Sequence, residues 1–169
     1  LLAALFQSVT LRTAGFASFN QDALTEASKL LSNILMFVGG SSGSTAGGVK
    51  TVTMGLVVLS AVSTMRGRRQ VTVFRRSISQ QDISNAVSVA LLVLGLSLFG
   101  AAVLTVCDRC SFLNAIYETT SALCTVGLTT GITGTLCAAS KLILIVFMFF
   151  GRVGIMTIGV GFMMGDRAR

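Results

Sequence analysis

Two short uncharged segments have residue types that can bind a cation through main-chain oxygen atoms: Thr13-Ala14-Gly15-Phe16 and Thr125-Val126-Gly127-Leu128. Gly15 and Gly127 allow a positive φ angle or a close approach of the backbone to an ion. Carbonyl groups held in this way can replace the hydration shell of the ion. Neither segment contains a carboxylate, so we expect a hard monovalent cation, because a divalent cation favours sites with Asp or Glu oxygens. The candidate ligands are the carbonyl groups of Thr13, Ala14, Gly15, Thr125, Val126 and Gly127.

The two segments belong to an internal repeat with a long period. Thr125 stands 112 positions after Thr13, and the same offset pairs residues 27–30 with residues 139–142, both Ala-Ser-Lys-Leu. The sequence of each copy predicts a short helix, then a glycine-containing loop, then a membrane helix. A pair of tight turns in an ordinary helix bundle is the alternative interpretation. Further matches at this offset are Leu11 with Leu123, Met36-Phe37 with Met148-Phe149, Gly39 with Gly151, Thr45 with Thr157 and Gly47 with Gly159.

The composition indicates a membrane protein. The 169 residues are 53% hydrophobic and only 11% charged, whereas a soluble domain has roughly 25% charged residues. The net charge of +7 would suggest nucleic acid as a partner of a soluble protein. Here the basic residues gather between apolar segments, so we interpret them as signals of membrane topology and expect no nucleic-acid partner.

The first copy contains a helix that is too short to cross a membrane. Residues 1–12 can form a helix of roughly 18 Å, against about 30 Å of hydrocarbon. We therefore expect a re-entrant pore helix, with an outer helix preceding residue 1. Residues 30–65 then hold a single charge, Lys50, and five glycines fall within residues 39–48. Because each glycine costs a helix about 1 kcal/mol, we expect a broken helix whose Gly/Ser segment lines an aqueous path.

The second copy predicts a complete set of elements. Five arginines between Arg66 and Arg76 mark the cytoplasmic side. Residues 83–107 carry no charge and predict a full crossing, followed by a short helix over residues 112–124. Residues 142–165 predict a return crossing, which places the C-terminus on the cytoplasmic side with the arginine loop.

Arg152 interrupts the last predicted crossing near its middle, about 16 Å along the helix from Lys141. An intramembrane arginine costs at least about 2.5 kcal/mol on insertion scales, so a functional role is the default. One hypothesis is a fixed positive charge that repels a passing cation until a gate rearranges. The other is a structural role, in which Arg152 binds carbonyl groups of the Gly/Ser segment. Arg12 also needs a counter-charge, and Glu118 is the best candidate.

Two features have rival interpretations. Gly43-x4-Gly48-Val49-Lys50 is nearly a phosphate-binding loop, but Val49 moves the lysine about 100° around a helix and no strand is predicted before it. We therefore expect neither nucleotide hydrolysis nor another enzymatic activity. Cys107-x-x-Cys110 lacks the roughly four ligands of a metal site. A redox pair or disulfide stays open there, inert small residues are favoured, and Cys124 is expected to pack beside its loop.

These motifs resemble those of the Trk/Ktr/HKT superfamily of potassium-uptake membrane subunits, and the resemblance covers nearly the whole chain. Residues 6–16 are similar to the third pore loop of the family, and residues 39–50 to the Gly-rich break in the next helix. Residues 117–128 are similar to the fourth pore loop, and residues 150–154 to part of the final helix. The order of the four motifs is also that of the family.

The resemblance implies an all-α membrane protein with four helix–pore-loop–helix repeats around one potassium pore. Residues 1–65 would form the third repeat, residues 66–82 a basic cytoplasmic loop and residues 83–169 the fourth repeat. The other two filter loops would come from the missing N-terminal half of the same subunit. The implied gate consists of Gly39, Gly40, Gly43, Gly47, Gly48, Lys50 and Arg152.

The resemblance also implies the surroundings of the chain. These are membrane lipid, the plasma membrane as the location, a homodimer, and a cytosolic ring of nucleotide-binding regulatory subunits that docks near residues 66–76 and the C-terminus. Potassium would be the transported ion, with no bound cofactor. A sodium-preferring channel or transporter subunit and a non-conducting membrane scaffold are the alternatives. Channel activity and coupling to sodium or protons both remain open from the sequence.

Overall fold

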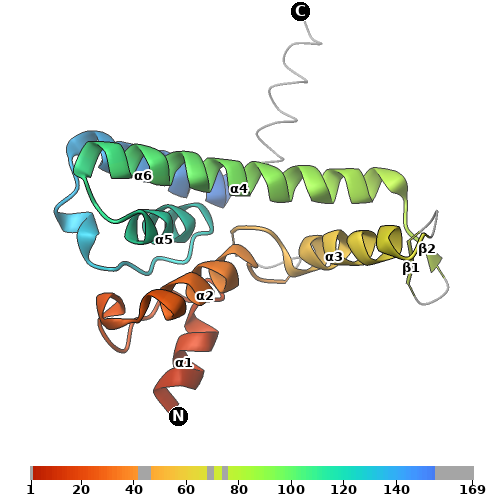
Figure 1. The fold of residues 1–169 in the computed structure, drawn as a ribbon, viewed down its shortest axis with the longest axis horizontal. Coiled ribbons are helices and arrows are strands. Elements are labelled where there is room, and N and C mark those ends of the chain that lie inside the picture. Colours follow the sequence, from red (N-terminus) through yellow and green to blue (C-terminus); the bar gives the residue numbers. More distant parts are fainter. Residues whose placement is uncertain (1, 42–46, 68–70, 74–75, 155–169) are drawn as a thin grey trace, which may run out of the picture.

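The computed structural model describes residues 2–41, 47–67, 71–73 and 76–154, and within them the fold is built from helices (Figure 1). Two 3-10 helices, η1 (Gln21–Ala23) and η2 (Ile132–Gly134), lie between longer elements. The α-helices are α1 (Leu2–Thr10), α2 (Glu26–Phe37), α3 (Thr51–Met65), α4 (Gln80–Asp108), α5 (Phe112–Leu123) and α6 (Ala138–Val153).

Helix α4 packs against three of the other α-helices. Among the described residues it alone is long and apolar enough to cross a membrane, with 29 residues. Figure 1 shows α5 below one half of α4 and α3 below the other, and α4 contacts α3, α5 and α6. Gly100 makes the close approach possible, because a Cβ atom there would lie 2.2 Å from the ring of Phe147 on α6. Small residues at helix crossings are the usual means of close packing in membranes.

Polar side chains join α4 to the helices packed on it. The hydroxyl of Thr119 on α5 donates a hydrogen bond to the carbonyl of Ser97 at 3.1 Å. Asp108 at the end of α4 accepts one from the amide of Cys137 at 2.7 Å and another from the hydroxyl of Ser140. The carboxylate of Asp108 therefore holds the start of α6 against the end of α4.

The two copies of the repeat have the same order of elements: short helix, loop, 3-10 helix, longer helix. Helices α2 and α6 begin at equivalent caps, because the side chains of Thr25 and Cys137 accept hydrogen bonds from the amides of Ser28 and Ser140. Lys29 and Lys141 also reach back the same distance along the chain. The ammonium of Lys29 lies 2.9 Å from the carboxylate of Asp22, and that of Lys141 lies 3.0 Å from the carbonyl of Gly134.

The segment predicted as one interrupted helix over residues 30–65 forms two helices. Helix α2 ends at Phe37 and α3 begins at Thr51. Val38 and Val49 form an isolated parallel bridge between them, and the amide of Gly39 donates to the carbonyl of Val49 at 2.8 Å. The bridge closes the base of the intervening loop, of which residues 42–46, including Gly43, lie outside the described residues.

Strands β1 (Thr72–Val73) and β2 (Arg76–Ser77) pair antiparallel, an element that the all-α prediction did not include. The β-branched Thr72 and Val73 favour extended backbone.

The crossing predicted over residues 142–165 is described only as far as Gly154, where α6 has ended.

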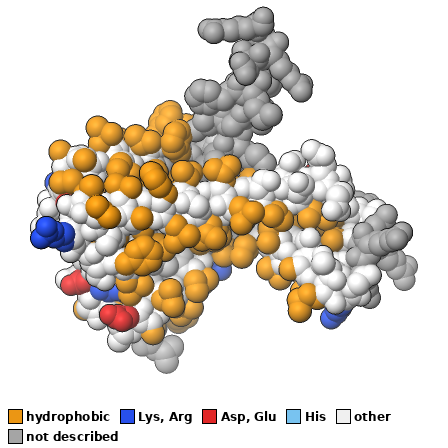
Figure 2. All heavy atoms as spheres, turned by 45° about the horizontal axis from the view of Figure 1, so that its top comes forward, with side chains coloured by type: hydrophobic (Ala, Val, Ile, Leu, Met, Phe, Trp, Pro, Cys, Tyr) orange, Lys and Arg blue, Asp and Glu red, His pale blue; other side chains and the backbone are white. Residues whose placement is uncertain are grey.

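Apolar side chains cover much of the outer surface. Figure 2 shows hydrophobic side chains spread over one face, with most of the visible charged side chains near its two ends. Exposed apolar surface of this extent is typical of a molecule that is covered by lipid or by other protein. Large exposed apolar side chains include Leu2, Val9, Leu31, Leu91, Phe99 and Ile145.

Candidate ion-coordinating site

The two glycine-containing loops have the same unusual backbone. Thr13 has φ 65° and Thr125 has φ 55°, and each is followed two residues later by a glycine with positive φ, 74° at Gly15 and 87° at Gly127. A left-handed conformation is rare for a β-branched residue. In the described part of the chain only three non-glycine residues have positive φ, and these two threonines are among them. Such outliers gather at functional sites, where surrounding structure enforces them.

The amide groups of both loops turn back onto the helix before them. In the second loop the amide of Val126 donates to the carbonyl of Ser121 at 2.9 Å. In the first loop the amides of Ala14 and Gly15 both donate to the carbonyl of Thr10, at 3.1 and 3.2 Å. These three amide donors are therefore satisfied within their own copy of the repeat.

The carbonyl groups of the loops are not used in this way. Throughout the described residues, none of the six candidate carbonyl oxygens accepts a hydrogen bond. Backbone carbonyl groups are strong acceptors that nearly always have a partner, whether protein, water or ligand. The six oxygens are those of Thr13, Ala14, Gly15, Thr125, Val126 and Gly127, all of the predicted ligands.

The two loops contact each other directly. A Cβ atom on Gly15 would lie 2.1 Å from the carbonyl oxygen of Val126 and 3.7 Å from the Cα of Gly127. Only a glycine fits at position 15, because the backbone of the other loop occupies the space of a side chain. The fold therefore places candidate ligands separated by more than one hundred residues side by side.

Side chains of the pore-helix candidates hold the exit of each loop. The hydroxyl of Thr10 accepts a hydrogen bond from the amide of Phe16 and donates one to its carbonyl, both at 2.7 Å. In the second copy the hydroxyl of Ser121 donates to the carbonyl of Leu128 at 2.6 Å. Each loop is thus fixed at both ends to its own short helix.

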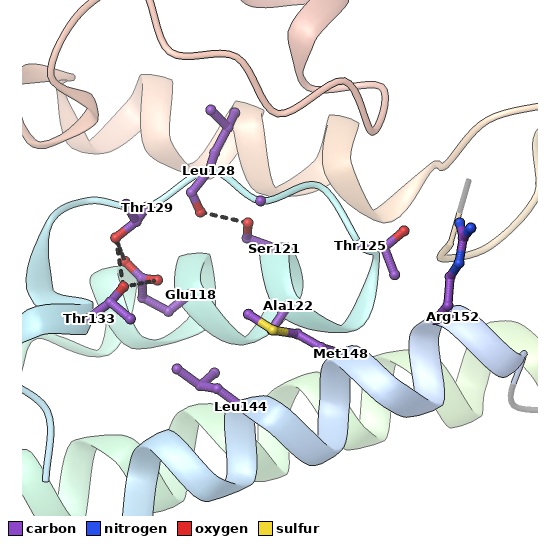
Figure 3. Close-up of a pocket in the computed structure, with 11 residues that line it drawn as sticks. Glu118, Ser121, Ala122, Thr125, Leu128, Thr129, Thr133, Leu144, Met148 and Arg152 are labelled. Atoms are coloured by element: carbon purple, nitrogen blue, oxygen red, sulfur yellow. Dashed lines mark hydrogen bonds between the residues drawn. The ribbon is translucent and has the colours of Figure 1, made fainter. Parts of the chain in front are cut away.

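The carboxylate of Glu118 does not pair with Arg12, so this prediction is wrong. Glu118 is buried and accepts hydrogen bonds from the side chains of Thr129, Thr130 and Thr133, whereas Arg12 is exposed. Figure 3 shows Thr129 and Thr133 directed at Glu118. The three threonines follow the loop closely in sequence, and their hydroxyl groups occupy the carboxylate oxygens.

Two glycines of the predicted gate contact the second loop. The amide of Gly47 donates a hydrogen bond to the hydroxyl of Thr125 at 2.9 Å, and a Cβ atom on Gly47 would lie 2.6 Å from that oxygen. A Cβ atom on Gly48 would lie 3.0 Å from the sulfur of Cys124, so Cys124 packs beside its loop against the gate segment.

Two other residues of the predicted gate close its base. Gly39 lies against the carbonyl of Gly47, which a Cβ atom would approach to 2.2 Å, and the carbonyl of Gly40 accepts from the amide of Thr51 at 3.2 Å. Lys50 stands at the N-cap position of α3, where its side chain makes no capping hydrogen bond, and it is half-buried. The rival phosphate-loop interpretation needs a strand before the glycines, and helix α2 stands there instead.

Comparison with known proteins gives the family. The TrkH profile, described as a cation transport protein, matches residues 1–167. The chain belongs to the TrkH family. It is therefore a membrane protein, and its described helices agree with that class.

Several TrkH-type relatives align with most of the chain. It is 41% identical over 157 residues to the Ktr system potassium uptake protein B of Bacillus subtilis, covering 93% of this chain and 35% of that protein. It is 38% identical over 157 residues to the potassium/sodium uptake protein NtpJ of Enterococcus hirae, covering 90% of this chain and 35% of the relative. The chain thus spans about a third of the length of these relatives.

In this TrkH chain, Arg152 shares a cavity with the second loop. The cavity has a volume of about 500 Å³ and is lined by residues that include Glu118, Thr125, Gly127 and Arg152. Figure 3 shows Glu118 toward one end and Thr125 and Arg152 toward the other. The cavity therefore runs alongside the loop from its exit to the level of the gate segment.

Sequence reasoning missed the role of Gly151, which precedes Arg152 on α6. A Cβ atom on Gly151 would lie 2.0 Å from the carbonyl oxygen of Leu123 and 3.1 Å from the methyl group of Thr125. Gly151 therefore lets α6 pack against the end of α5 at the start of the loop. The sequence signal for this role was the match of Gly151 with Gly39 across the repeat. In the structure both glycines contact backbone carbonyl groups.

Proposed function

We propose that the chain forms the last two of four pore-loop repeats of a potassium-uptake subunit, with the six loop carbonyls as half of its selectivity filter. The observation that carries this proposal is the set of six carbonyl oxygens that accept no hydrogen bond from any described residue, on two loops of matching backbone that touch each other. Neutral carbonyl dipoles suit a monovalent cation, which can exchange its water for them.

The short helices support a cation at this place. Helices α1 and α5 both end at the loops, so the negative ends of their dipoles lie beside the candidate ligands. Each dipole is equivalent to roughly half a negative charge at the helix C-terminus. The names of the Bacillus subtilis and Enterococcus hirae relatives state potassium or potassium/sodium uptake, which supports the same ion for this chain.

The other half of the filter, and the part of the first copy that precedes its pore helix, would come from elsewhere in the same subunit. In the second copy, Thr119 and Phe147 contact α4, Thr119 at Ser97 and Phe147 at Gly100. Their equivalents in the first copy, Gln7 and Leu35, line a groove of about 410 Å³ between α1 and α2. We assign this groove to an outer helix that corresponds to α4.

The gate would be the segment between α2 and α3, with Lys50 and Arg152. The hydrogen bond between Gly47 and Thr125 gives this segment a direct connection to the filter. Potassium would enter the cell through the plasma membrane, with the loop at residues 66–76 and the C-terminus on the cytoplasmic side. A homodimer and a cytosolic nucleotide-binding regulatory ring complete the proposed assembly, and the words "Ktr system" in the name of the Bacillus subtilis relative support a system of several components.

The test is growth of a potassium-uptake-deficient strain that carries the complete gene. We expect rescue at low external potassium by the natural sequence. Gly127→Ser is expected to weaken the preference for potassium, because a side chain is strained at φ 87°. Arg152→Ala is expected to raise flux by removing a positive charge beside the path.

Three outcomes would favour another function. No rescue and no ion flux by a normally inserted protein would favour a non-conducting scaffold. Uptake that is faster for sodium than for potassium would favour the sodium-preferring alternative, for which the printed name of the Enterococcus hirae relative is the supporting observation. Tolerance of Ala at both Gly15 and Gly127, without loss of flux, would show that the loops do not conduct.

A further inference from the structure

The buried carboxylate of Glu118 accepts hydrogen bonds from the residues that follow the second loop. One oxygen of Glu118 accepts from the hydroxyl of Thr129 at 2.6 Å, the amide of Thr130 at 2.9 Å and the hydroxyl of Thr130 at 3.1 Å. The other oxygen accepts from the hydroxyl of Thr133 at 2.9 Å. The Glu118 residue is only 5% exposed. Hydrogen bonds to a carboxylate are roughly twice as strong as those between neutral groups.

These contacts act on the part of the loop that regular structure does not hold. Residues 126–130 belong to no helix or strand. Thr129 follows Gly127 by two positions, and Ser121, one turn after Glu118 on α5, holds the carbonyl of Leu128. The face of α5 that carries Glu118 and Ser121 therefore fixes the direction in which the chain leaves Gly127.

The first copy fixes its exit without a charged group. The residue equivalent to Glu118 is Phe6, which is exposed, and the hydroxyl of Thr10 alone binds both the amide and the carbonyl of Phe16. The carboxylate is thus specific to the second loop. The internal repeat does not explain it, and a common fold for the two copies does not require it.

We propose that Glu118 is a positioning residue for ion selection, which holds the Val126 and Gly127 carbonyls in place through the threonines at the loop exit. The inference rests on the proposed filter. Selection between ions of similar charge depends on the positions and number of the coordinating carbonyl dipoles. A looser exit lets these dipoles follow a smaller ion inward, so the preference for potassium over sodium falls.

The experiment compares three variants of the complete subunit in cells, with the ratio of initial potassium to sodium uptake as the readout and membrane content measured alongside. Glu118→Gln keeps the shape of the side chain but replaces one acceptor with a donor. Thr133→Val removes the hydrogen bond to the second carboxylate oxygen, together with the contact of 2.8 Å between the hydroxyls of Thr133 and Thr129. Thr135→Val is the matched control, because the exposed Thr135 donates to the carbonyl of Ile132 and not to Glu118.

We expect Glu118→Gln to lower the uptake ratio about tenfold, which corresponds to roughly 1.4 kcal/mol. Thr133→Val should lower the ratio by a smaller factor, and Thr135→Val should leave it unchanged. An unchanged ratio in both Glu118→Gln and Thr133→Val, at normal membrane content, would overturn the inference. If Glu118→Gln fails to accumulate, the result of Thr133→Val decides.

The same cells separate this inference from the proposed function. Absence of potassium uptake by the natural sequence would reject the filter itself. Selective uptake by the natural sequence with unchanged ratios in the variants would leave the filter in place and reject only the role of Glu118. A purely structural role would lower the amount of protein in the membrane without changing the ratio.

Discussion

The Cα of Gly15 lies against the carbonyl oxygen of Val126, so closely that a Cβ atom would come within 2.1 Å of that oxygen. By contrast, a Cβ atom on Gly127 would meet nothing within 4 Å in the described structure. The two glycines occupy equivalent places in the repeat and both have positive φ. Gly15 is therefore constrained by both its backbone conformation and its contact with Val126, whereas Gly127 is constrained by its conformation alone.

This difference predicts the effects of Gly15→Ala and Gly127→Ala. A left-handed conformation costs a non-glycine residue about 1–2 kcal/mol, and both variants should lose that amount. Gly15→Ala adds the collision with Val126 and should lose more, together with most potassium flux. Thermal unfolding in detergent and uptake by cells measure the two effects. Equal losses in both variants would mean that the loops do not touch in the native protein.

The contact of α4 with α6 predicts opposite results for two glycines on one helix. Gly100→Ala places a methyl group 2.2 Å from the ring of Phe147, and overpacking of this kind costs about 1–3 kcal/mol. Gly95→Ala meets nothing within 4 Å and should change stability by less than about 1 kcal/mol, in the stabilising direction. The free energy of unfolding of both variants is the measurement. Greater stability of Gly100→Ala than of Gly95→Ala would contradict this packing.

The hydrogen bond from Gly47 to Thr125 predicts a distinction between Val and Ser at position 125. Thr125→Val removes the acceptor oxygen, whereas Thr125→Ser retains it. If the bond holds the gate segment beneath the loop, Thr125→Val should raise basal potassium flux and speed hydrogen exchange of the Gly47 amide.

Two controls test this prediction. Thr125→Ser should behave like the natural protein in both measurements. Thr13→Val provides the matched control from the other copy, because the hydroxyl of Thr13 makes no hydrogen bond to any described residue. Faster exchange at Gly47 in Thr13→Val, or unchanged exchange in Thr125→Val, would count against the connection.

Lys29 joins the two copies, and its loss should cost more than the loss of its equivalent. Its buried ammonium lies 2.9 Å from Asp22 and 3.1 Å from the amide oxygen of Asn114 on α5. Asp22 is exposed, so solvent screens that ion pair, and we expect Lys29→Met to cost about 1 kcal/mol. Lys141→Met, which loses one exposed contact to Gly134, should cost less than about 0.5 kcal/mol. A larger loss for Lys141→Met would disprove the bridging role of Lys29.

Local features were accessible from the sequence because they depend on neighbouring residues. The repeat offset located both loops, since Thr-x-Gly with matching flanks needs no knowledge of packing. The short helix predicted over residues 112–124 corresponds to α5, which ends at Leu123, and the glycines of residues 39–48 predicted that α2 would not continue into α3. Composition and the deficit of charge indicated a membrane protein, the class to which the TrkH family belongs.

Long-range contacts were decided only by the tertiary structure. The sequence suggested Arg12 as the partner of Glu118, but threonines brought back by the chain after the loop occupy the carboxylate. The repeat marks Gly15, Gly47 and Gly151 as matched glycines, but it does not identify Val126, Thr125 and Leu123 as the residues that they contact, because those residues come from other parts of the chain. The repeat predicts what each copy resembles, whereas the packing of one copy against the other decides which atoms meet.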